Sequence, residues 1–137
     1  YWENGMRAMS ANRPLRLPTD VKGLRFRIEP SEVMQAQYRV LGATTIRVPF
    51  GKVRDALRLG LVGGQENAWS NIYSQNFDEF QSHFLDLCHS YLGYMLVTSS
   101  DFWDNLPPDI RSALDQIIVE VSGEVNRIAR EKAKSDR

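Results

Sequence analysis

In the segment Val21–Glu29, apolar and charged residues alternate with a period of two after Gly23. Leu24, Phe26 and Ile28 fall on one face, and the charged residues between them, among them Arg27, fall on the other. Successive side chains of a β-strand point to opposite sides, so this period is typical of a strand with one buried face. The pattern therefore predicts a strand over 21–29.

A helix and a second strand are expected after this first strand. Pro30 and Ser31 are residues that begin helices, and the apolar positions after them recur at helical spacing. Gly42 can end that helix, because glycine readily adopts the left-handed conformation. Ala43–Val48 is then predicted to be a strand, which Pro49 stops.

Shorter elements alternate in the same way over residues 51–98. We expect a helix over Gly51–Leu59, a brief strand at Leu61–Val62, a polar turn, a helix over Ala68–Tyr73, and strands over Phe84–Cys88 and Tyr91–Thr98. Strands that alternate with helices at this spacing are typical of parallel β-α-β units. The predicted fold class is therefore α/β.

The end of the chain predicts one long helix. Ser99 or Ser100 can cap a short helical turn, and Pro107 and Pro108 can stand in the first turn of the helix that follows. Apolar residues recur from there at a helical spacing as far as about Lys134, which predicts a helix with one apolar stripe.

Composition and charge exclude several classes of protein. The 137 residues include 17 Lys and Arg and 17 Asp and Glu, so the chain has no excess of positive charge for binding DNA or RNA. No stretch approaches the roughly 20 apolar residues that a membrane-spanning helix needs. The one cysteine, Cys88, excludes an internal disulfide but does not fix the compartment.

Three side chains are predicted to meet at one edge of the sheet. Arg27 is at a polar position near the end of a strand, Phe50 follows the next strand, and Asn67 lies in the polar turn after two glycines. Open α/β sheets bind ligands at the carboxyl ends of their strands. A guanidinium, an amide and an aromatic ring placed there could bind a carboxylate on a small carbon skeleton.

Each of these residues also has an ordinary structural interpretation. Arg27 could be an exposed strand residue that pairs with Glu29 or Asp20, Asn67 could cap the short helix, and Phe50 could belong to the core. Trp69 could either line a pocket, with its indole N–H as a donor, or pack beneath that helix.

Acidic and thiol-bearing residues suggest other possibilities. Glu66 would repel a bound acid unless it pairs with an arginine, so we expect a structural ion pair, which Gln65 could help to orient. His83, Cys88 and His89 are candidates for a metal or nucleophile site. Side chains of neighbouring strand residues point to opposite faces, and no fourth ligand stands at a metal-like spacing, so no metal is expected.

The ordered motifs of this chain resemble one protein family over nearly its whole length. The motifs are Trp2–Arg7, Gly23–Ile28, Val48–Phe50, Gly64–Asn67 and Phe102–Pro107. Their order and spacing are similar to those of the extracytoplasmic solute-binding subunits of TRAP transporters, the DctP type. Members of that family are considerably longer, and this chain begins at Tyr1 inside a motif, so it is expected to be the central and later part of such a protein.

The resemblance implies a fold and a division of the chain. It implies a periplasmic-binding-protein-like fold of two α/β lobes, incomplete here, with a long C-terminal helix. Residues 8–90 would form the second lobe with the carboxylate-binding residues. Residues 1–7 and 91–137 would supply crossing strands and the long helix, which belong to or join the first lobe.

The resemblance also implies a function and site residues. The protein would be an exported, periplasmic subunit, with its signal peptide outside this chain, that captures a small organic acid and delivers it to membrane subunits. It would need no cofactor and would not be an enzyme. The ligand-binding residues implied by the resemblance are Arg27, Asn67, Arg7, Phe50 and Trp69. Arg7 would contact the ligand or support Arg27, although a surface arginine beside Trp2 is its ordinary interpretation.

The sequence departs from the family pattern at two positions, and two other functions remain possible interpretations. Gly63 stands where the family commonly has an acid and Ala68 where it commonly has proline, and both changes loosen the backbone around Asn67. The same fold could instead serve a signalling partner as a ligand-sensing module. An enzyme acting on a carboxylic acid, with Glu66 or His89 as the base, is the other alternative.

Overall fold

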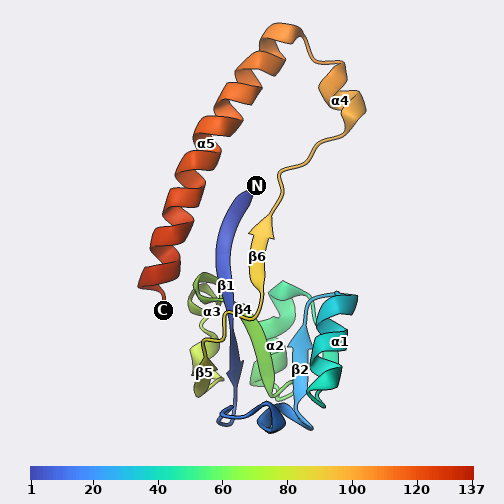
Figure 1. Ribbon diagram of the computed structural model, residues 1–137, viewed down its shortest axis with the longest axis vertical. Helices are drawn as coiled ribbons and strands as arrows, with labels where there is room; N and C mark the ends of the chain where they lie inside the picture. The colour runs from blue at the N-terminus through green and yellow to red at the C-terminus, as the bar shows by residue number, and fades with distance from the viewer.

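A mixed sheet of six strands forms the centre of the fold (Figure 1). The computed structural model describes residues 1–137. The strands are β1 (Trp2–Ala11), β2 (Arg25–Ile28), β3 (Thr44–Arg47), β4 (Gly64–Ala68), β5 (His83–Leu85) and β6 (Tyr91–Tyr94). Five of them have the order β3-β2-β4-β1-β5, and β6 pairs with the first half of β1. Strands β2 and β3 are parallel, as predicted, and β4, a strand that was not predicted, is parallel to β2. Strand β1 is antiparallel to β4, β5 and β6.

Helices lie on both sides of the sheet and beyond its end. The α-helices are α1 (Glu32–Val40), α2 (Val53–Arg58), α3 (Trp69–Ser74), α4 (Ser100–Asp104) and α5 (Pro108–Ser135). Short 3-10 helices cover Pro18–Val21, Phe50–Lys52 and Phe77–Glu79. No helix is long and apolar enough to cross a membrane.

The residues predicted to begin and end α1 do so in the structure. The Ser31 hydroxyl accepts a hydrogen bond from the backbone N–H of Met34 at 3.3 Å, which satisfies one of the free donors of the first turn. Gly42 ends the helix at φ +77°, a conformation that costs other residues energy because of their Cβ atom. Ser99 caps α4 in the same way, through the N–H of Phe102.

The predicted polar turn is in fact a strand. The strand expected at Leu61–Val62 is absent, and Gly64–Ala68 forms β4 instead, with all five of its residues buried. Strand β4 lies between β1 and β2, which supply its backbone hydrogen bonds on both sides. The prediction was wrong because three of the buried side chains are polar, so the hydrophobic pattern of a strand is lost.

Other strand boundaries differ from the prediction as well. Strand β5 ends at Leu85 and β6 at Tyr94, so both are shorter than expected. Cys88 lies between them at φ +48°, a left-handed conformation that no strand residue adopts. The resemblance implied a crossing strand within residues 1–7, whereas β1 continues to Ala11.

Two apolar clusters lie on opposite faces of the sheet. Met9, Phe26 and Ile28 pack on the α1 side, where the ring of Tyr38 stacks on Phe26 with 4.2 Å between centroids. The other cluster joins β1 to α2 and α3; its buried members are Ala8, Val53, Ala56, Leu57, Val62, Ile72 and Phe77. Side chains on alternate positions of one strand therefore enter different layers.

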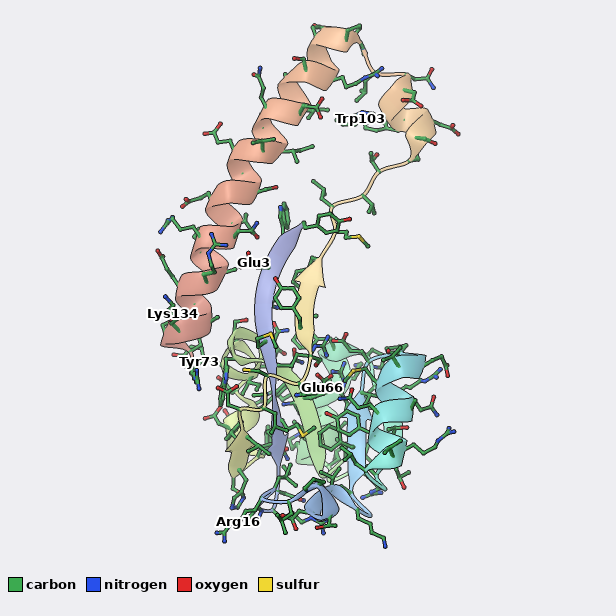
Figure 2. The ribbon with its side chains drawn as sticks, in the orientation of Figure 1. Glu3, Arg16, Glu66, Tyr73, Trp103 and Lys134 are labelled. Carbon is green, nitrogen blue, oxygen red and sulfur yellow. The ribbon has the colours of Figure 1, made fainter.

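Helix α5 lies beside β1 and has no buried residue. The indole N–H of Trp2 donates to the Ser122 hydroxyl at 2.9 Å, and Arg130 pairs with Glu3 at 2.8 Å. Figure 1 shows α4 and the start of α5 far from the sheet, while the end of α5 returns towards it. In Figure 2, Trp103 accordingly lies at the far end of the molecule from Glu66.

The close contact between β4 and β2 makes a testable prediction. A Cβ on Gly64 would lie 2.7 Å from two ring atoms of Phe26 and 3.1 Å from the Ser10 carbonyl oxygen. We expect Gly64→Ala in the complete protein to lower the free energy of unfolding by about 1–3 kcal/mol, as overpacking of a core does.

Gly123 provides the matched control, because nothing lies within 4 Å of a Cβ built there on α5. Gly123→Ala should raise the free energy of unfolding by about 0.5–1 kcal/mol through helix propensity. Urea denaturation measures both variants, and a Gly64→Ala protein as stable as the wild type would contradict the packing described here.

Candidate functional site

Arg27 is a buried arginine whose guanidinium is only partly bonded. Its side chain is 0% exposed, and its Nε donates to the Val48 carbonyl oxygen at 2.9 Å. Nη1 and Nη2 are buried and have no hydrogen-bond partner. Burial lowers the pKa of Arg27, and the charges of Glu29 and Glu66 oppose this shift. The bond to Val48 directs the guanidinium, while its two outer nitrogens keep their donors free.

Asn67 lies on the same face of the sheet as Arg27. Arg27 is opposite Gln65 in the parallel pair of β2 and β4, so Asn67 is two residues further along on the same side. The Oδ1 atom of Asn67 accepts hydrogen bonds from the Ala68 N–H at 3.1 Å and from Nδ2 of Asn71 at 2.7 Å. Its Nδ2 is buried without a partner. The alternative interpretation of Asn67 as a helix cap is wrong, because Ala68 is the N-cap of α3 and no side chain caps it.

Two aromatic residues follow strands of the same sheet, Phe50 after β3 and Trp69 after β4. Phe50 stands just after β3, is 36% exposed, and contacts Phe77 edge-on at 6.4 Å between centroids. Trp69 directly follows β4 and packs against Phe84 at 5.8 Å. The Nε1–H of Trp69 is buried and has no acceptor. Phe50 thus keeps part of its ring accessible, and Trp69 both packs in the core and retains a free donor.

Arg7 lies on the opposite face, with Glu66. Its Nη1 is 2.5 Å from Glu66 Oε1 and its Nη2 is 3.3 Å from Glu29 Oε2. Burial alone would lower the pKa of Arg7, but the hydrogen bonds and charges of the two carboxylates raise it. Arg7 is 7% exposed, so the interpretation as a surface arginine is wrong. The expected ion pair of Glu66 with an arginine is confirmed.

Gln65 belongs to a separate buried network and does not orient Glu66. Its Nε2 donates to the Ser10 hydroxyl at 2.8 Å, and that hydroxyl donates to Oε1 of Gln81 at 3.1 Å. All three residues are buried. They join β4, β1 and the segment before β5, on the side of β4 away from β2, so they stabilise the strands that carry Arg27 and Asn67.

The histidine and cysteine residues form no metal site. No three His, Cys, Asp or Glu side chains are grouped so as to hold a metal ion. Cys88 and His89 are not in a strand, contrary to the prediction. His89 lies 3.9 Å from Glu66 Oε2 and 3.4 Å from the Tyr38 hydroxyl, and burial lowers the pKa of His89.

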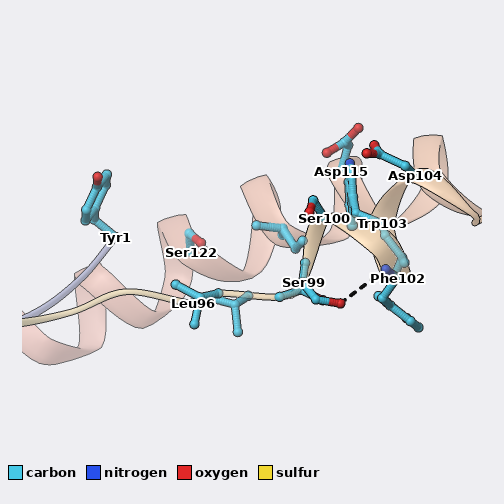
Figure 3. Close-up of a pocket in the computed structure, with 13 residues that line it drawn as sticks. Tyr1, Leu96, Ser99, Ser100, Phe102, Trp103, Asp104, Asp115 and Ser122 are labelled. Atoms are coloured by element: carbon cyan, nitrogen blue, oxygen red, sulfur yellow. Dashed lines mark hydrogen bonds between the residues drawn. The ribbon is translucent and has the colours of Figure 1, made fainter.

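A separate groove lies between α5 and the segment that leads from β6 to α4 (Figure 3). Leu96, Phe102 and Trp103 contribute apolar surface to it, and Asp104 and Asp115 contribute carboxylates. None of its lining residues is basic, and none is a predicted site residue. Acidic side chains would repel an organic acid, so this groove does not match the predicted ligand.

The α2 and α3 side of the sheet therefore collects donors that lack acceptors. They are Arg27 Nη1, Arg27 Nη2, Asn67 Nδ2 and Trp69 Nε1. Buried polar groups are normally hydrogen-bonded, and leaving them unpaired is costly. A guanidinium with both Nη groups free matches the two oxygens of one carboxylate. The arrangement is chemically suited to bind an anion.

The chain matches one family model from its first residue to its last. The model, DctP, is described as "Bacterial extracellular solute-binding protein, family 7", and it covers residues 1–137. The chain belongs to this DctP family. The ordered motifs of the sequence therefore identified the family correctly.

Curated relatives and solved structures agree with the family model. C4-dicarboxylate-binding periplasmic protein DctP of Vibrio cholerae is 42% identical over 92% of this chain, and that of Rhodobacter capsulatus is 41% identical over 96%. A TRAP periplasmic solute-binding protein of Pseudomonas aeruginosa with bound L-malate is 42% identical over 99% of the chain, with a TM-score of 0.95. One of Shewanella oneidensis with bound succinate is 44% identical over 98%, with a TM-score of 0.96.

The match covers only part of each relative. The chain spans 38–40% of the two curated DctP proteins and 44–47% of the two solved chains. Its mixed sheet and helices are thus the fold of less than half of such a protein. The predicted periplasmic-binding-protein-like α/β fold is confirmed to that extent.

Sequence reasoning missed how Glu29 joins the two arginines. Glu29 is 35% exposed and lies 3.8 Å from Arg27 Nη1 as well as 3.3 Å from Arg7. The alternation of the strand does place Glu29 on the same side as Arg27, which makes a pairing of the two one interpretation of the sequence. The contact with Arg7 depends on the neighbouring strands and left no signal in the sequence.

The buried pair of Arg7 and Glu66 makes a testable prediction. We expect Arg7→Met to lower the free energy of unfolding by about 3–5 kcal/mol, because Glu66 then remains buried without its partner. The double variant Arg7→Met/Glu66→Leu should recover a large part of this loss. Urea denaturation of the complete protein measures the coupling in a double-mutant cycle.

The exposed pair of Arg54 and Glu79 is the matched control for this cycle. Its atoms are also 2.5 Å apart, but its side chains are 43% and 47% exposed. Its coupling should stay below about 1 kcal/mol because solvent screens the charges. Purely additive effects at Arg7 and Glu66 would show that their ion pair is not a structural link.

Proposed function

We propose that the protein to which this chain belongs is the solute-binding subunit of a TRAP transporter, and that it captures a small organic acid by its carboxylate. The observation that carries this proposal is the buried guanidinium of Arg27, whose two Nη groups have no acceptor. The names of the relatives, all binding proteins, favour transport over signalling.

The residues on the α2 and α3 side of the sheet suggest how the ligand is held. Arg27 would bind one carboxylate through both Nη groups, and Asn67 Nδ2 and Trp69 Nε1 would donate to remaining oxygens of the ligand. Phe50 would pack its accessible ring against the carbon skeleton. Arg7, already bonded to two carboxylates, would support the site and not contact the ligand.

C4-dicarboxylates are the first ligands to test. Relatives 41–42% identical to this chain are named for binding them, and structures 42–44% identical hold L-malate and succinate. Binding would occur in the periplasm, without turnover, and the loaded protein would deliver the acid to the membrane subunits of the transporter. No step in this sequence requires a cofactor.

We also propose that the chain contributes to two lobes. Residues 8–90 would form one lobe with the site, while residues 1–7 and 91–137 would join or belong to the other. The separation of α4 and the start of α5 from the sheet supports this division (Figure 1). The exposed apolar side chains of Met95, Leu96 and Val97 support it too, since they offer a surface for packing.

The role of Arg27 is tested by calorimetric titration of the complete protein with succinate and L-malate. Arg27→Ala should weaken binding by about 2–5 kcal/mol, or about 30-fold to several thousand-fold, because it removes a buried charge-assisted contact. Arg27→Lys keeps the charge but loses the planar pair of donors. The affinity of this variant should therefore lie between that of the wild type and that of Arg27→Ala.

Arg25→Ala is the matched control, since Arg25 is an exposed arginine two residues earlier on the same strand. Its affinity for both acids should stay within about twofold of the wild type, as expected for a surface substitution away from the site. An Arg27→Ala protein that binds these acids as tightly as the wild type would refute the proposed site.

A further inference from the structure

Glu29 is the acid that stands beside the free end of Arg27. Its Oε1 is 3.8 Å from Arg27 Nη1, which is an ion-pair distance but too long for a hydrogen bond. Its Oε2 accepts from Arg7 Nη2 at 3.3 Å, at the long end of the range for such bonds. Glu29 is thus held between two arginines and forms a short contact with neither.

The contrast with Glu66 shows that Glu29 is not needed to neutralise Arg7. Glu66 is fully buried and lies 2.5 Å from Arg7 Nη1. Glu29 is 35% exposed, so its carboxylate has access to solvent. Only Glu29 among the acidic residues lies within 4 Å of the Arg27 guanidinium.

The charges of this cluster balance before any ligand arrives. The guanidinium groups of Arg7 and Arg27 carry two positive charges, and the carboxylates of Glu29 and Glu66 carry two negative charges. A carboxylate bound to Arg27 would add a third negative charge close to Glu29 Oε1. Like charges at such a distance repel one another, and the repulsion grows with the charge of the ligand.

We propose that Glu29 is a specificity-determining residue, an internal anion that competes with the ligand for Arg27 and disfavours ligands of higher negative charge. This inference rests on the proposed function. In the free protein Glu29 compensates the buried guanidinium of Arg27. On binding, the ligand carboxylate takes over that compensation, and Glu29 turns towards solvent or remains as a repelling neighbour.

The test compares two ligands of different charge on the complete protein at pH 8. Succinate carries two negative charges there, and monomethyl succinate carries one on nearly the same skeleton. Glu29→Gln keeps an oxygen that can accept from Arg7 but removes the charge. We expect it to tighten succinate binding at least fivefold, with a smaller gain for monomethyl succinate, because charge repulsion at this range exceeds 1 kcal/mol.

Glu32→Gln is the matched control, because it removes the same charge three residues away. Glu32 is 85% exposed and pairs with Arg47 on the surface. Its affinity for both ligands should stay within twofold of the wild type. An equal gain in Glu32→Gln would show a general effect of net charge and would overturn the inference.

A second measurement needs no ligand. Glu29→Gln should lower the melting temperature of the free protein, because Arg27 loses the charge that compensates it. Glu29→Asp withdraws the carboxylate by one methylene group. It should change the affinity and the melting temperature in the same directions as Glu29→Gln does, but by smaller amounts. It serves in place of Glu29→Gln if that variant does not fold.

The outcomes separate this inference from the function on which it rests. A wild-type protein that binds no organic acid would overturn both. Organic acids that bind the wild type and Glu29→Gln equally well, or bind Glu29→Gln more weakly, would overturn the inference alone. Weaker binding would mean that Glu29 holds Arg27 in place for the ligand.

Discussion

The site depends on a guanidinium that the protein buries and directs but does not satisfy. The hydrogen bond from Arg27 Nε to the Val48 carbonyl oxygen fixes the plane of the group, and burial removes it from water. Its outer nitrogens are left without acceptors. A buried charge in this state is costly to the folded protein, and an anion with two coplanar oxygens relieves the cost. In the proposed function, relief of this cost would contribute to the free energy of ligand binding.

The two buried arginines, Arg7 and Arg27, lie on opposite faces of the sheet and have different partners. Arg7 and Glu66 form a buried ion pair on the side of α1, which ties β1 to β4. Arg27 lies on the side of α2 and α3, with the free amide of Asn67. Glu29, at the end of β2, lies close to both arginines and is the one acid of the cluster open to solvent. The structural ion pair and the proposed binding residues therefore lie on different faces of the sheet, and Glu29 links their charges.

Much of this arrangement could be predicted from the sequence where hydrophobic periodicity is strong. The alternation correctly placed Arg27 in a strand, although β2 covers only Arg25–Ile28 of the predicted 21–29 and Val21 ends a 3-10 helix. The apolar stripe of α5 marked a helix that ends near the predicted residue. Strand β4 was missed because its buried residues are largely polar, and most of β1 because its pattern is mixed. The pairing of Arg7 with Glu66, 59 residues apart, arises only from strand register, which the sequence does not display.

The most direct test of the central claim is a crystal structure of the complete protein with bound succinate. The account predicts one carboxylate with an oxygen within about 3 Å of each Nη atom of Arg27, in the bidentate geometry of such pairs. It would be contradicted if succinate lay elsewhere, or if atoms from the rest of the polypeptide accepted hydrogen bonds from both Nη groups. In either case the free donors of Arg27 would not be the anchor of the ligand.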